Sequence, residues 1–213
     1  MADTHAFNGA RSALLIVDLQ NDFLAPDGAY ARGGATSAAA AALPPRVATV
    51  ARAVKAAGGM VVASQFTLWP DAHGEPMIAP HLLHLRPFLR RGDFAPGSHG
   101  QANVAELDGL VDVAFAKVAY SAFFNTQLEW VLRHAGIDTV IVCGIVTNGG
   151  VASTARDAHM REFHTVVMSD GCAAFKEPVH AASLTDLATV ADIVTCDQVV
   201  AGLNSSRTAR HAS

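Results

Sequence analysis

Short apolar runs alternate along the chain with longer amphipathic or alanine-rich stretches. The apolar runs predict strands over residues 13–18, 60–66, 111–117, 139–143, 165–169 and 193–196. The stretches between them predict helices over residues 43–57, 126–134, 148–163 and 180–190. Strands that are apolar throughout and alternate with helices are typical of parallel sheets covered on both faces. The pattern therefore predicts a single α/β domain over residues 1–213, with a doubly wound, six-stranded parallel sheet in a Rossmann-like three-layer sandwich.

Composition and charge narrow the partners that the chain can bind. Hydrophobic residues make up 51% of its 213 residues, and its formal net charge of -4 gives no basic footprint for nucleic acid or an acidic membrane. No apolar run reaches the roughly 18 residues that cross a bilayer, and the first residues lack the pattern of a secretory signal. The three cysteines lie far apart, which favours a reducing compartment. We therefore expect a cytoplasmic protein that binds a small-molecule substrate, not a nucleic acid or a membrane.

Two charged residues stand at the ends of predicted strands. Asp18 closes the first strand and Lys117 the third. Ligands of open α/β sheets bind at the carboxyl ends of the strands, so both side chains are expected at one edge. Such a pair can move a proton near neutral pH, because burial raises the pKa of a carboxyl and a nearby ammonium lowers it. A purely structural ion pair is an equally good interpretation of their positions.

Residues 144–150 hold three glycines and lead into a predicted helix. Backbone N–H groups at such a place suit an anion or a developing oxyanion. The spacing matches neither GxGxxG nor a Walker-type GxxxxGK[ST]. A tight strand-to-helix turn is the simpler explanation.

Metal binding finds little support in the sequence. Several potential ligands lie in the irregular, proline-rich segment 67–111, without a third and fourth partner at a diagnostic spacing: Asp71, His73, His81 and His84. We interpret them as loop residues and predict no metal. Cys143 lies inside a predicted strand and is expected to be a buried, inert thiol, whereas Cys172 and Cys196 are expected to follow strands five and six.

Three segments together carry a family resemblance. They are ALLIVDLQNDF at 13–23, KVAYSAFFNTQLEWVLR at 117–133 and GIVTNGGVASTARDAHMREFHTVVMSDGCAAF at 144–175. In this order and at these separations the chain resembles the isochorismatase-like hydrolases, from about residue 13 to about residue 196. That superfamily includes isochorismatases, nicotinamidases, N-carbamoylsarcosine amidohydrolases and ureidoacrylate amidohydrolases. The resemblance implies a hydrolase without a cofactor, in homodimers or homotetramers.

The resemblance assigns roles to three positions. Asp18 and Lys117 match the acid and the lysine of the family's catalytic triad, and Gly150 stands where most members have the nucleophilic cysteine. Without a thiol the covalent route of the amidase members is closed. Isochorismatases proper also have glycine there, and their acid protonates a vinyl ether, after which water captures the oxocarbenium ion.

The resemblance also points to residues that contact the substrate. Gln65 matches a glutamine of isochorismatases and Tyr120 a tyrosine that both branches share, and the resemblance also assigns Phe23, Val146 and Thr147 to substrate binding. It implies a cis peptide bond just before Thr147.

Other positions favour the amidohydrolase branch, and two motifs of the relatives are missing from this sequence. Asn21, Asp22 and the Thr147-Asn148 pair are typical of amidohydrolases. The arginine that isochorismatases place after the glutamine has no clear counterpart. The zinc-binding DxH of nicotinamidases would fall on Gln65 and Thr67, which argues against a bound metal.

Three hypotheses follow. In the first, Asp18 is a general acid, tuned by Lys117, in the hydrolysis of isochorismate or another vinyl ether. In the second, the protein is of the amidohydrolase type, acting on a C–N bond, with its cysteine replaced by Gly150. In the third, the protein binds a small molecule without reaction.

Overall fold

The computed structural model describes residues 6–211, with side chains as far as residue 205. Its centre is a six-stranded, wholly parallel sheet in the order β3-β2-β1-β4-β5-β6. The strands are β1 Ser12–Val17, β2 Met60–Phe66, β3 Val113–Lys117, β4 Thr139–Ile145, β5 His164–Ala173 and β6 Asp192–Val194. The chain starts in the middle, moves to one edge and then crosses to the other, so the predicted doubly wound sheet is confirmed.

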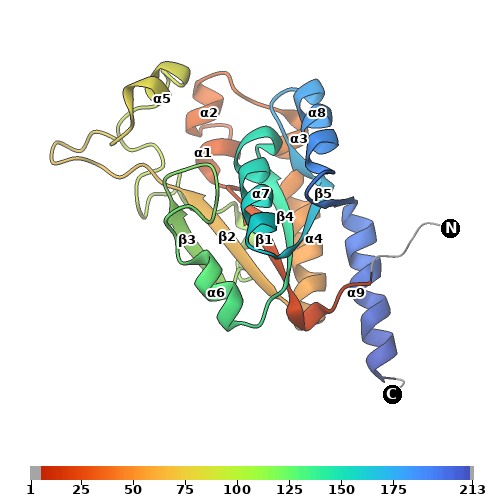
Figure 1. Ribbon diagram of the computed structural model, residues 1–213. Coiled ribbons are helices and arrows are strands. Elements are labelled where there is room, and N and C mark those ends of the chain that lie inside the picture. The colour runs from red at the N-terminus through yellow and green to blue at the C-terminus, as the bar shows by residue number, and fades with distance from the viewer. Residues whose placement is uncertain (1–5, 212–213) are drawn as a thin grey trace.

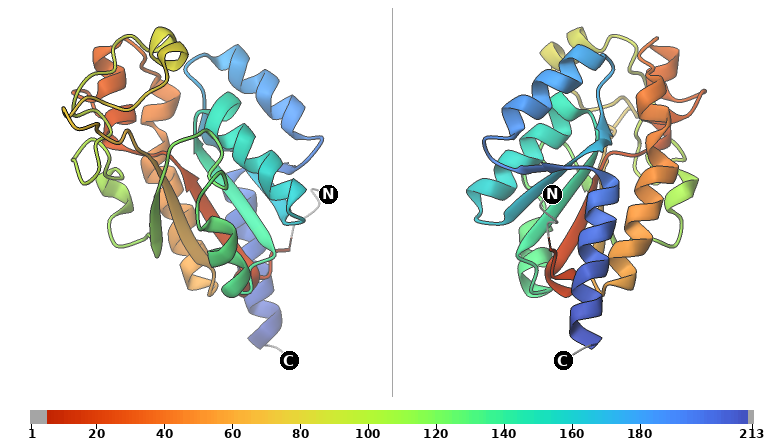
Figure 2. Two further views of the ribbon diagram at one scale, coloured as in Figure 1. Left: turned by 60° about the vertical axis from the view of Figure 1, so that its left-hand side comes forward. Right: turned by 90° about the vertical axis from the view of Figure 1, so that its right-hand side faces the viewer.

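Helices cover both faces of the sheet (Figures 1 and 2). One face carries α4 Leu43–Ala56 and α9 Cys196–His211, and the other carries α6 Leu128–His134 and α7 Ala152–Met160. Every residue of β1 is buried, as expected for a strand packed between two helical layers. The hydrophobic core therefore lies on both sides of the central strands.

Short helices gather at the carboxyl ends of the strands (Figure 1). They are α1 Asn21–Leu24, α2 Ala29–Arg32, α3 Ala38–Ala41 and α5 Pro80–Leu85, and the longer α8 Glu177–Leu187 lies nearby. Single 3-10 turns occur at Gly9–Arg11 and Ala105–Leu107. The segment predicted to be irregular thus contains α5, none of whose residues is buried.

Several predicted bounds differ by a few residues; the sixth strand ends at Val194, so that Cys196 begins α9, and two elements differ more. The helix expected over residues 148–163 is a π-type turn, η3 Thr147–Val151, followed by the shorter α7. The fifth strand continues to Ala173 after a register shift, pairing Gly144 with Cys172. The prediction that Cys172 follows this strand is therefore wrong, because polar residues in the middle of β5 hid its second half.

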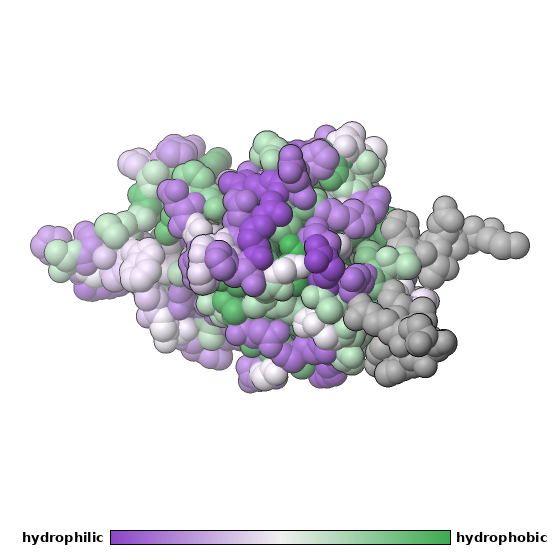
Figure 3. All heavy atoms as spheres, turned by 60° about the horizontal axis from the view of Figure 1, so that its bottom comes forward, coloured by the Kyte–Doolittle hydropathy of each residue, from purple (hydrophilic) through white to green (hydrophobic). Residues whose placement is uncertain are grey.

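Two observations concern the outer surface. On the face opposite the carboxyl edge, hydrophilic and hydrophobic residues are interspersed (Figure 3). Within residues 6–211, no helix combines the length and the apolar character needed to cross a membrane.

Candidate active site

The two predicted charged residues meet at the carboxyl edge of the sheet. Lys117 Nζ lies 2.7 Å from Asp18 Oδ2, and the two side chains are 1% and 6% exposed. Ser64 Oγ donates a hydrogen bond to Asp18 Oδ1 at 3.0 Å. Lys117 Nζ also donates to the carbonyl oxygens of Ala119 at 2.9 Å and Tyr120 at 3.2 Å. The structure thus contains a buried ion pair in which both partners have further hydrogen bonds.

Burial changes the acidity of Asp18. Removal from water raises the pKa of this carboxyl above its ordinary value, and it outweighs the lowering by Lys117 and by the Ser64 hydrogen bond. A carboxyl with a raised pKa holds its proton at a higher pH than an exposed one. Asp18 can therefore act as a proton donor or acceptor closer to neutrality.

Gly150 faces this ion pair from η3. A Cβ on Gly150 would lie 3.4 Å from Asp18 Oδ2, 3.2 Å from the carbonyl oxygen of Ile145 and 2.9 Å from Val17 Cγ1. A side chain here would point at the carboxylate and press on Val17. Gly150 therefore leaves one side of the Asp18 carboxylate free of protein side chain.

The turn before Gly150 has an unusual backbone. A cis peptide bond joins Ile145 and Val146, one residue earlier than the bond expected before Thr147. The N–H groups of Gly149 and Val151 both donate to the Val146 carbonyl oxygen, at 2.9 and 3.3 Å. These two N–H groups therefore have partners within the turn and are not free to bind an anion. For them, the interpretation of the glycine-rich segment as a tight strand-to-helix turn is supported.

A cavity of about 200 Å³ opens above the ion pair. Six of the predicted site residues line it, and they come from three separate parts of the chain: Asp18, Phe23, Lys117, Tyr120, Val146 and Gly150. The cavity wall is mainly apolar, with Tyr30, Phe66, Ile78, Leu82, Leu89 and Phe175 among its residues. Such a mostly hydrophobic pocket with a few polar groups is typical of a small-molecule site.

Two predicted residues do not line the cavity. Ser64 and Phe66 both reach the site, so Gln65 between them points to the other face of β2. Thr147 is buried, and a hydrogen bond of 2.8 Å joins its Oγ1 to His180 Nδ1. Neither side chain is placed to contact a ligand in this cavity.

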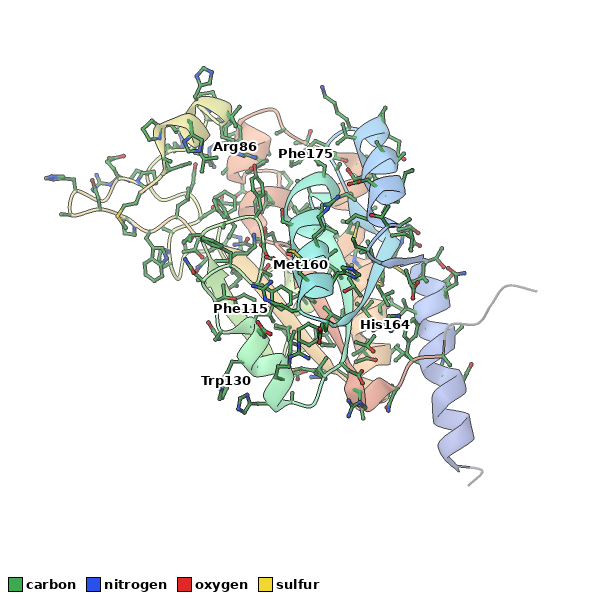
Figure 4. All side chains as sticks on the ribbon, viewed as in Figure 1. Arg86, Phe115, Trp130, Met160, His164 and Phe175 are labelled. Carbon is green, nitrogen blue, oxygen red and sulfur yellow. The ribbon has the colours of Figure 1, made fainter. Side chains whose placement is uncertain are left out.

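Arg86 was not foreseen from the sequence. It follows α5 and lines the cavity, although the segment after Gln65 showed no clear counterpart of the expected arginine. Its Nε donates to Tyr30 Oη at 2.8 Å and its Nη2 to Tyr120 Oη at 3.0 Å. Figure 4 shows Arg86 and Phe175 near the carboxyl ends of the strands. Its position next to Pro87 in a segment without periodicity gave no signal.

Asn21 and Asp22, which follow Asp18 closely, have structural contacts. Asp22 is buried, and its carboxylate accepts hydrogen bonds from the N–H groups of Ala29 at 3.0 Å and Phe94 at 2.7 Å. Asn21 donates to the His99 carbonyl oxygen at 2.8 Å. These contacts join the loops around the cavity.

Neither the cysteines nor the potential metal ligands take part in the site around Asp18. All three thiols are buried outside the cavity wall, and burial raises the pKa of Cys143 and Cys172, and that of Cys196 to about 12. They stay protonated at neutral pH and are poor nucleophiles. Among the described residues, no three His, Cys, Asp or Glu side chains come together in a group that could hold a metal ion.

Comparisons with known proteins agree with this geometry. The isochorismatase domain family matches residues 12–198, which include all six strands. Ureidoacrylate amidohydrolase RutB of Yersinia enterocolitica is 35% identical over 175 residues, covering 78% of this chain and 76% of that protein. A cysteine hydrolase from Pseudomonas syringae has a TM-score of 0.81 and 27% identity, covering 97% of this chain and 100% of the other. N-carbamoylsarcosine amidase from Thermoplasma acidophilum has a TM-score of 0.70 and 26% identity, covering 88% and 97%. This chain therefore belongs to the isochorismatase family of hydrolases.

Proposed function

We propose that this protein hydrolyses a small, carboxylate-bearing vinyl ether without a covalent enzyme intermediate, with Asp18 as the general acid. The observation that carries the proposal is the position of Gly150, whose Cβ would lie 3.4 Å from Asp18 Oδ2. A residue with a nucleophilic side chain is absent from this position, and a substrate atom can approach the carboxyl group from that side.

The reaction needs one proton donor and one water molecule. Asp18 gives its proton to the terminal vinyl carbon, and the electrons of the double bond form the new C–H bond. The ether-bearing carbon becomes an oxocarbenium ion, which takes up water. The added water loses a proton to the Asp18 carboxylate, and the hemiketal then separates into an alcohol and a ketone. The raised pKa of Asp18 fits the first step, because the protonated carboxyl persists to a higher pH.

Lys117 acts on Asp18 and not on the substrate in this mechanism. A lysine ammonium has three N–H donors, and those of Lys117 are directed at Asp18 Oδ2 and at the carbonyl oxygens of Ala119 and Tyr120. Its charge stabilises the carboxylate that forms when Asp18 gives up its proton. Arg86 is the cavity's other cation, and its guanidinium fits a substrate carboxylate.

A second candidate function is hydrolysis of a C–N bond. Its support is the 35% identity to a ureidoacrylate amidohydrolase. Asp18 would then be a general base that removes a proton from the attacking water. The two functions need opposite protonation states of Asp18 at the start of the reaction.

Turnover in deuterated water separates them. The protein is incubated with small vinyl ethers that carry a carboxylate and, separately, with ureidoacrylate, and the products are followed by NMR. The proposal expects a ketone whose new methyl group carries one solvent deuterium.

Asp18→Asn should lower the rate by about 10²- to 10⁴-fold, the usual contribution of a positioned acid or base. Asp27→Asn, at an exposed carboxylate, is the matched control and should keep full activity. Cleavage of ureidoacrylate alone supports the second candidate, and binding without turnover of either class overturns both.

A further inference from the structure

The cavity has one cation that no carboxylate neutralises within the part of the chain that the structure describes. Three charged side chains line it, namely Asp18, Lys117 and Arg86. Asp18 and Lys117 form the ion pair described above, and all three donors of Lys117 are used. Among the described residues, no Asp or Glu lies within ion-pair distance of Arg86. The wall therefore offers one unit of uncompensated positive charge.

Arg86 orients two phenol groups as hydrogen-bond donors. Its Nε and Nη2 donate to the hydroxyl oxygens of Tyr30 and Tyr120, so each phenol accepts from the arginine and keeps its own O–H proton to give. Neither phenol proton has an acceptor among the described residues. Tyr30 is only 6% exposed, and burial raises its pKa, which keeps the donor protonated. A guanidinium has five N–H donors, so further ones remain for a ligand.

Much of the rest of the wall is aromatic. Phe23 and Tyr30 have ring centroids 4.5 Å apart, and Tyr30 and Phe175 stack at 5.4 Å with an interplanar angle of 20°. Phe66 continues this surface next to Phe23, at 6.2 Å. An apolar cavity of about 150 Å³ holds benzene. The 200 Å³ found here is therefore large enough for one six-membered ring with a short substituent.

We propose that the substrate of this site has one ring and one carboxylate, and that Arg86, Tyr30 and Tyr120 together bind the carboxylate. This inference rests on the function proposed above and narrows its substrate class. A second carboxylate, as in isochorismate, would lie against apolar side chains or near the Asp18 carboxylate without a free cation to pair with. Since a desolvated, unpaired charge is costly, the site discriminates against dicarboxylates.

Binding of ligands that cannot be cleaved tests the inference apart from catalysis. Calorimetric titrations compare benzoate, isophthalate, phthalate and acetate with the wild-type protein. We expect benzoate to bind at least about tenfold more tightly than either dicarboxylate or acetate, which corresponds to about 1.4 kcal/mol. Equal or tighter binding of a dicarboxylate would overturn the single-carboxylate assignment. Equal binding of acetate and benzoate would overturn the ring assignment.

Variants test the three binding residues. Arg86→Gln should weaken benzoate binding about tenfold or more, and Tyr30→Phe and Tyr120→Phe several-fold each, because each removes one donor to a charged acceptor. Arg90→Gln, an exposed arginine of the same segment, is the matched control and should bind benzoate like the wild type. Unchanged binding in Arg86→Gln would refute the assignment. Because benzoate has no cleavable bond, a protein that binds it as expected yet cleaves no vinyl ether would contradict the proposed function alone.

Discussion

Removing Lys117 should destabilise the protein through the carboxylate that it leaves behind. In Lys117→Met, Asp18 stays buried and loses its ion-pair partner at 2.7 Å. Breaking a buried pair from one side costs about 3–5 kcal/mol in free energy of unfolding. For a chain of this length the melting temperature should fall by about 10 °C, since 1 kcal/mol corresponds to about 2–4 °C.

The penalty should depend on pH with a defined sign. The Asp18 pKa is already raised by burial, and loss of Lys117 raises it further. The folded variant therefore holds a proton that the unfolded chain releases above a pKa of about 3.9. The contribution of Asp18 to the variant's stability is greatest below that pH, and it falls by about 1.4 kcal/mol per pH unit as pH rises toward the folded-state pKa.

Urea denaturation at pH 5 and pH 7 measures this effect. Lys55→Met is the matched control, because Lys55 pairs with Asp112 at the surface, where both side chains are 35% exposed. That change should cost less than about 1 kcal/mol. The double variant Asp18→Asn with Lys117→Met should recover much of the loss, and its unfolding free energy should lack the part of the pH dependence that Asp18 contributes. A Lys117→Met penalty equal to that of Lys55→Met, or one that does not change with pH, would refute the reasoning.

Three shorter predictions concern neighbouring residues. If Asp18 is the acid, kcat/KM for the vinyl ether should fall as pH rises through its raised pKa, and a profile that rises instead would show Asp18 acting as a base. Gly144→Ala should lower the free energy of unfolding, measured by urea denaturation, by more than about 3 kcal/mol, because φ of Gly144 is 113° and a Cβ would collide with the Val17 carbonyl oxygen. An unchanged urea midpoint would contradict this. Gly150→Cys should fold with a loss of about 1–3 kcal/mol from crowding of Val17, and its thiol should react with iodoacetamide when the buried native thiols do not.

The ends of the strands could be predicted from the sequence, whereas the walls of the cavity could not. Asp18 and Lys117 follow apolar runs, and a parallel sheet aligns the carboxyl ends of all its strands, so their meeting required only the fold. Arg86 reaches the cavity from a segment without periodicity. Nothing in its local sequence shows that it would meet Tyr30, which lies 56 positions earlier.

Gln65 and Thr147 were predicted at the right places in the chain, but their side chains do not line the cavity. Gln65 and Phe66 are neighbours on β2, and the alternation of a strand sends only one of them to the site. The sequence favoured Gln65 by resemblance, but the face is decided by how β2 pairs with β1 and β3. Thr147 is likewise at the right place in the chain, and its side chain is turned toward His180 by the shape of η3.

The energetics of the Asp18–Lys117 pair favour a chemical role over a structural one. A buried ion pair contributes little net stability, because the desolvation of two charges offsets their attraction, and apolar residues could join strand ends equally well. Here the pair lies at the base of a mainly apolar cavity, beside a glycine that exposes the carboxylate and within the same wall as an arginine that no described carboxylate neutralises. A structural pair would need none of these neighbours. A proton donor needs each of them, since the substrate must reach the carboxyl group and its own charge must be held away from it.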